Sequence, residues 1–132
     1  STYADAPGAK GDVDAIKVGF VYNFTRFIRW PPTDPNTAPP AFVIVVVGDS
    51  AMLGQLAVLE QGNHRADGRP IRVEAVTDPA AIPACSMLFI GSDAAGQVDA
   101  ILRQLANRAV LTIGDTPGLA RRGVAINFYR QR

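Results

Sequence analysis

Residues 42–50, "FVIVVVGDS", run through six consecutive apolar positions and then turn polar at a Gly-Asp pair. A strand that is apolar at every position is buried on both faces, which is typical of parallel sheets. The same pattern returns at 87–93 ("MLFIGSD") and at 110–116 ("VLTIGDT"). Helix-compatible sequence follows each of these runs. The chain is therefore predicted to alternate strands and helices around a parallel sheet.

Two further strands are expected beside this series. Residues 69–76 ("RPIRVEAV") alternate, which predicts a strand with one exposed face near an edge, and residues 123–129 ("GVAINFY") predict a final strand. Helices are expected at 51–61, 94–106 and 117–122. Together these elements predict an α/β fold, a three-layer sandwich with a mostly parallel central sheet and an aromatic-rich N-terminal helix packed on it.

The N-terminal helix is predicted to begin at Gly11–Asp12 and to end before Pro31, because proline disfavours helical geometry in the residue before it. At about 100° per residue one apolar stripe forms, and this stripe is predicted to be core. Its members are Val13, Ile16, Phe20, Phe24 and Phe27.

The opposite face of this helix is the candidate partner or dimer interface. It carries Val18, Tyr22, Arg26 and Arg29. Tyrosine and arginine together are typical of protein interfaces and their hot spots. The alternative is that a neighbouring segment of the same chain simply covers Tyr22.

The whole chain, residues 1–132, is expected to form one domain. Residues 1–11 are predicted to be a flexible N-terminus, either an expression scar or the mature start after removal of a signal peptide. Residues 31–41 hold five prolines between 31 and 40 and predict a stiff linker within the domain. No run of about 18 apolar residues is present, so a transmembrane span is not expected.

Polar side chains follow the three buried strands and form the candidate strand-end ligand edge: Asp49, Asp93, Asp115 and Thr116. The carboxyl ends of parallel strands meet at one edge, where ligands bind in such sheets. Three acids there could hold Mg²⁺. Helix capping is the preferred interpretation, because helices are expected to start at the same points.

No catalytic set is apparent in the sequence. The net charge of +1 favours neither nucleic acid nor an acidic partner. The single histidine, His64, is interpreted as a solvated loop residue, and the single cysteine, Cys85, as a small buried hydrophobe. No metal, cofactor or enzymatic activity is therefore expected.

Four blocks in order resemble the YfiR-like family. They are "AIKVGFVYNFTRFIRWP" (15–31), "FVIVVVGD" (42–49), "GRPIRVEAV…CSMLFIGSD" (68–93) and "VLTIGDTPGLARRGVAINF" (110–128). The resemblance implies a periplasmic regulator that restrains the periplasmic part of a membrane diguanylate cyclase, which lowers cyclic-di-GMP signalling and biofilm formation.

The leading hypothesis is thus a non-catalytic signalling module that is secreted, does not insert into the membrane, and forms a homodimer. A second hypothesis is a stand-alone small-ligand sensor, in which the aromatic helix and the strand ends shape a pocket. A third is an enzyme that uses the strand-end acids. Replacing Val18 and Tyr22 is expected, under the leading hypothesis, to weaken the interface with little loss of stability.

Overall fold

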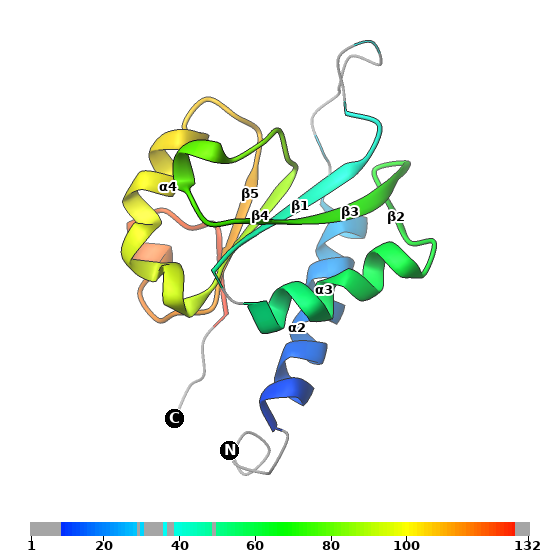
Figure 1. The fold of residues 1–132 in the computed structure, drawn as a ribbon, viewed down its shortest axis with the longest axis horizontal. Helices are drawn as coiled ribbons and strands as arrows, with labels where there is room; N and C mark the ends of the chain where they lie inside the picture. Colours follow the sequence, from blue (N-terminus) through cyan, green and yellow to red (C-terminus); the bar gives the residue numbers. More distant parts are fainter. Residues whose placement is uncertain (1–8, 29, 31–35, 37–38, 49, 129–132) are drawn as a thin grey trace.

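The computed structural model describes residues 9–28, 30, 36, 39–48 and 50–128, and Figure 1 shows their arrangement. Much of the predicted N-terminal stretch and of the proline-rich linker lies outside these residues. The described part is a mostly parallel sheet with helices on both faces. The predicted α/β sandwich is confirmed.

The sheet has six strands in the order β2-β3-β1-β4-β5-β6. Their bounds are β1 Phe42–Val47, β2 Arg65–Ala66, β3 Arg69–Val76, β4 Met87–Ile90, β5 Leu111–Gly114 and β6 Ile126–Asn127. All pairs are parallel except β2 with β3. The three apolar runs are adjacent and central, with Ile44 beside Met87 and Met87 beside Leu111. The prediction that these three runs are strands of a parallel sheet is confirmed.

The short hairpin of β2 and β3 was not predicted, although the sequence carries its signal. Asp67 and Gly68 connect the two strands, and both have positive φ, at 52° and 74°. Positive φ at both central residues defines the tight hairpin turn that favours Asp-Gly. This hairpin brings the loop that contains His64 back beside the sheet, as Ile71 N–H donates to the His64 carbonyl at 3.4 Å.

Helices α2 (Ala9–Phe27) and α3 (Ser50–Gln61) cover one face of the sheet, and α4 (Val98–Leu105) covers the other (Figure 1). The predicted helix at 94–106 is divided, because a 3₁₀ segment, η2 (Ser92–Gln97), precedes α4. Shorter 3₁₀ turns are η1 (Pro79–Ala81) and η3 (Ala120–Arg122). The final strand β6 is shorter than predicted.

The α4 face of the core is aliphatic. Val45, Leu88 and Ile90 of the sheet meet Val98 and Ile101 of α4, and each is at most 1 % exposed. Of the described residues that pack on this face, none is aromatic. The buried positions of α4 recur at a helical spacing, so its orientation follows directly from its sequence.

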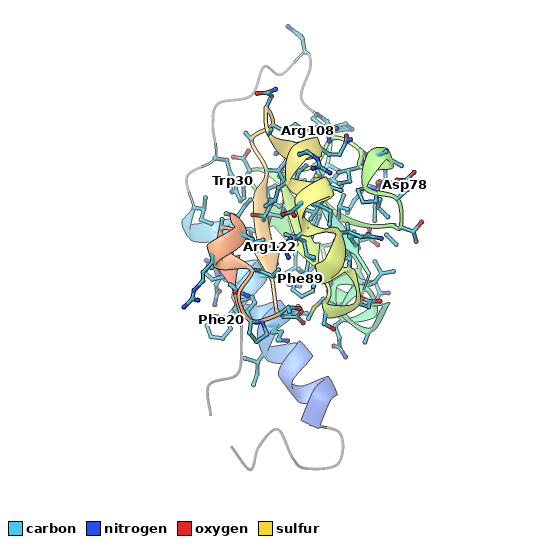
Figure 2. All side chains as sticks on the ribbon, turned by 90° about the vertical axis from the view of Figure 1, so that its left-hand side faces the viewer. Phe20, Trp30, Asp78, Phe89, Arg108 and Arg122 are labelled. Atoms are coloured by element: carbon cyan, nitrogen blue, oxygen red, sulfur yellow. The ribbon has the colours of Figure 1, made fainter. Side chains whose placement is uncertain are left out.

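The α2/α3 face of the core contains the aromatic side chains. Phe42 and Phe89 from the sheet are almost fully buried there, together with Met52 and Leu56 of α3. Helix α2 contributes Val21, which is 1 % exposed. Figure 2 shows Phe89 inside the body and Phe20 at its periphery.

Candidate functional site

The orientation of α2 differs from the sequence prediction. Among the α2 side chains that the structure describes, Val21 and Thr25 are buried, at 1 % and 3 % exposure, whereas Ile16 and Phe20 are 47 % and 49 % exposed. The predicted core stripe is therefore wrong at Ile16 and Phe20. The side chain of Phe27, the last member of that stripe, lies outside the described part of the chain.

Physical chemistry explains why the more polar face of α2 points inward. Thr25 is buried, and its hydroxyl donates to the Tyr22 carbonyl one turn earlier, which satisfies the polar group within the helix itself. Val18 and Tyr22 are half-buried and pack on the same cluster as Val21. A threonine whose hydroxyl bonds within its own helix behaves almost as an apolar residue. The core stripe predicted from the sequence contained only apolar residues and therefore did not include Thr25.

Tyr22 is covered by a neighbouring segment of the same chain. The His64 ring lies edge-on to the Tyr22 ring, with 4.9 Å between the ring centroids. His64 is half-buried, so its interpretation as a solvated loop residue is wrong. The unpredicted hairpin explains the error, because it returns the histidine to the surface of α2.

The exposed side of α2 carries an apolar surface, which we call the α2 patch and define as Ile16 and Phe20 with the flanking Phe24 and Phe128. The rings of Phe20 and Phe24 lie 5.9 and 6.2 Å from the ring of Phe128, which follows β6. Phe24 and Phe128 are half-buried. The patch therefore joins the N-terminal helix to the last strand of the sheet.

The four residues of the predicted interface have different environments. Val18 and Tyr22 contribute to packing within the chain, Arg26 is exposed, and Arg29 lies outside the described residues. The involvement of these residues in a partner contact stays a prediction. Among the described side chains of α2, the large exposed apolar ones are instead Ile16 and Phe20.

At the predicted ligand edge, Asp93 lies against the end of β1. Gly48 has φ 85°, and a Cβ atom built there would lie 2.3 Å from Asp93 Oδ1. Only glycine allows this close approach with that backbone angle. Asp93 sits in the first turn of η2, whose N-cap is Gly91, so Asp93 is not the N-cap residue that the sequence predicted. Asp49 lies outside the described residues.

Asp115 connects the end of β5 to α2. Its Oδ2 lies 3.2 Å from Lys17 Nζ, and the two side chains are only 7 % and 18 % exposed. The helix-capping role predicted for Asp115 is therefore replaced by an ion pair. Within the described part of the chain, Asp115 Oδ1 and the Thr116 hydroxyl are buried without hydrogen-bond partners. A role for this edge in ligand binding stays a prediction.

Asn127 closes the loop beyond Asp115. Its amide nitrogen donates to the carbonyls of Gly114 and Thr116 at 3.2 and 2.9 Å, and its amide oxygen accepts from Ala120 N–H at 3.2 Å. These bonds hold the strand-end loop in one conformation. The asparagine was not singled out from the sequence, where it is one polar residue in a predicted strand.

The described side chains were compared with the requirements of a metal site and of a thiol nucleophile. They contain no group of three His, Cys, Asp or Glu residues that could hold a metal ion. Burial raises the pKa of the Cys85 thiol to about 11, against an ordinary value of 9.0, and the nearby Arg108 offsets this only in part. The thiol is thus protonated at neutral pH and is a poor nucleophile.

A second cluster, also missed by the sequence analysis, lies at the opposite end of the sheet. The Trp30 ring packs edge-on against the Phe42 ring, with 5.0 Å between the ring centroids. The indole N–H of Trp30 donates to the Thr25 carbonyl at 3.2 Å. The guanidinium of Arg69 lies 5.6 Å from the centre of the Phe42 ring and donates to the carbonyls of Pro39 and Ala41. These contacts fix the end of α2 to the start of β1.

The fold and its surfaces define an α/β domain with a two-faced N-terminal helix. Among the described residues, no helix has both the length and the apolar character needed to cross a membrane. A model of the YfiR/HmsC-like family matches residues 14–132, and the chain belongs to this family. No curated protein matches the chain significantly. Family membership is consistent with a periplasmic regulator.

Proposed function

We propose that this protein is a non-catalytic periplasmic regulator that binds and restrains the periplasmic part of a membrane diguanylate cyclase. Restraint of the cyclase lowers cyclic-di-GMP and biofilm formation. Family membership supports the class of function. The α2 patch is the observation that supports a protein partner, because it leaves Ile16 and Phe20 about half exposed side by side on one helix.

The partner surface is centred on the α2 patch. Ile16 and Phe20 are one helical turn apart, so they form a continuous ridge. Such a ridge fits an apolar groove on a partner. Aromatic residues in this position are typical of the few side chains that contribute most binding energy.

The test is binding of the purified protein to the periplasmic part of a diguanylate cyclase from the same organism. The double variant Ile16→Ser with Phe20→Ser is expected to weaken binding by at least tenfold, corresponding to about 1.4 kcal/mol or more. In cells, the same variant is expected to raise cyclic-di-GMP.

The matched control is Val58→Ser, because Val58 is 54 % exposed on α3 and offers similar apolar area elsewhere. It is expected to bind as the wild type does. Full binding by the double variant would overturn the assignment of the partner surface. Absence of binding by the wild-type protein to each periplasmic cyclase domain tested would overturn the proposed function.

Self-association is a separate prediction for the same surface. Two-fold pairing is the commonest form of self-association, and we propose that such a pairing would bury the α2 patch. Sedimentation of the wild type and of the double variant distinguishes the two uses. A wild-type dimer that becomes a monomer on replacement of Ile16 and Phe20 would place the homodimer contact on this surface.

A further inference from the structure

A surface pocket that is open to solvent, called the cavity below, lies where α2 ends beside the β2–β3 hairpin. Its volume is about 380 Å³, and its lining includes Thr25, Arg26, Ile28, Trp30, Arg65 and Ala66. Pockets of about 300–1,000 Å³ are the usual size for small-molecule sites. The cavity is distinct from the α2 patch and from the strand-end edge, and no step of the proposed function uses it.

The charge around this cavity is positive. Arg26 is exposed, and Arg65 uses one of its donors on the Gly68 carbonyl, at 2.7 Å. A guanidinium has five N–H donors, so both arginines keep donors for a ligand. The nearest carboxylate in the lining, Asp67, is engaged by Arg69 at 3.3 Å. The lining therefore holds two arginines against one carboxylate, and that carboxylate is paired with Arg69.

The rest of the lining is apolar and held in place. Ile28 and Ala66 supply aliphatic surface, and Trp30 supplies an aromatic ring. The indole is fixed at two points, by its hydrogen bond to the Thr25 carbonyl and by its edge-on contact with Phe42. Figure 2 places Trp30 beside the C-terminal end of α2, away from Phe20. A fixed ring costs little conformational entropy when a ligand packs on it.

We propose that this cavity binds a small anionic molecule with an apolar body, with the carboxylate or phosphate group held by Arg26 and Arg65 and the apolar part against Trp30 and Ile28. Arginine is suited to this task, because its planar donors match the oxygens of both anions. The site would give the domain a small-molecule input that is separate from its protein partner. The inference does not rest on the proposed function.

Trp30 is the only tryptophan of the chain, so its fluorescence reports on this cavity alone. The experiment is a titration with phenyl phosphate, which combines an aromatic ring with an anion. Inorganic phosphate and benzyl alcohol each supply one half of that molecule. A saturable change in Trp30 emission is expected with phenyl phosphate, and a much weaker response with either half.

Two variants test the residues. Arg26→Ala and Arg65→Lys are each expected to weaken phenyl phosphate binding about tenfold, which is typical of the loss of a hydrogen bond between charged groups. The matched control is Arg72→Ala, because Arg72 is a highly exposed arginine on β3 outside the lining, and it should leave binding unchanged.

Three results would overturn the proposal. The first is no saturable change in Trp30 emission with phenyl phosphate. The second is binding of benzyl alcohol that is as tight as that of phenyl phosphate, which would show that the ligand need not be an anion. The third is binding that neither Arg26→Ala nor Arg65→Lys weakens.

Discussion

The two faces of the sheet are closed in different ways. On the α4 face, aliphatic side chains from one short helix bury Val45, Leu88 and Ile90 almost completely. On the α2/α3 face, two helices and several aromatic rings cover the sheet, yet Phe20 remains about half exposed. A helix that only completes a core has no need of a second apolar face. The difference supports the proposal that α2 also contacts a partner.

The largest effect is expected inside the aromatic face. Phe89→Ala removes a ring that is 1 % exposed on a central strand, and it should lower the free energy of unfolding by about 3–5 kcal/mol. Ile101→Val, on the α4 face, should cost only about 0.5–1.5 kcal/mol. Urea denaturation measures both. If Phe89→Ala lowered the free energy of unfolding by less than Ile101→Val does, the burial described for this face would be contradicted.

A smaller loss is expected for the double variant Val18→Ser with Tyr22→Ala. Both side chains are half-buried against the core, so their combined loss should cost about 2 kcal/mol. This reverses the expectation from the sequence, under which stability would hardly change. Thermal denaturation decides between these two expectations. An unchanged midpoint would favour the sequence prediction that Val18 and Tyr22 contact a partner.

The ion pair between α2 and the strand end should contribute less. Lys17→Met leaves the Asp115 carboxylate without its cation at a site that is only 7 % exposed, and a loss of about 1–2 kcal/mol is expected. Adding Asp115→Asn removes the unpaired charge and should recover part of that stability. A double variant that is less stable than Lys17→Met alone would show that the pair does not act as described.

The smallest effect is expected on the exposed side of α2. Phe20→Ser removes a half-exposed ring and its contact with Phe128. The free energy of unfolding should therefore fall by less than about 1 kcal/mol. Chemical denaturation again provides the measurement. A loss comparable to that of Phe89→Ala would mean that Phe20 belongs to the core after all.

The sequence was enough to predict an element and its buried face where a single pattern of apolar or turn residues was present. The β1 and β4 runs are apolar throughout and β5 has only Thr112 as a polar side chain, so their place in a parallel sheet was predictable. Helix α4 carries a single apolar stripe, so its buried face was predictable as well. The Asp67–Gly68 turn also carried a usable signal, since Asp-Gly favours a tight hairpin.

The sequence did not suffice where two apolar faces compete, as in α2. Periodicity assigned Phe20 to the core, whereas the structure buries Val21 and Thr25. Thr25 satisfies its hydroxyl within the helix, and Tyr22 is covered by His64 from a distant loop. Lys17 and Asp115 are 98 residues apart, and no local pattern links them. Contacts of this kind depend on the tertiary fold.

The orientation of α2 is the central claim, and cysteine labelling tests it most directly. Cys85 is the only native cysteine, so Phe20→Cys and Val21→Cys are each made in a Cys85→Ser background. With a maleimide reagent under native conditions, the Phe20→Cys thiol is predicted to react at least tenfold faster than the Val21→Cys thiol, with the difference lost in urea. Equal rates, or faster labelling at position 21, would contradict the account.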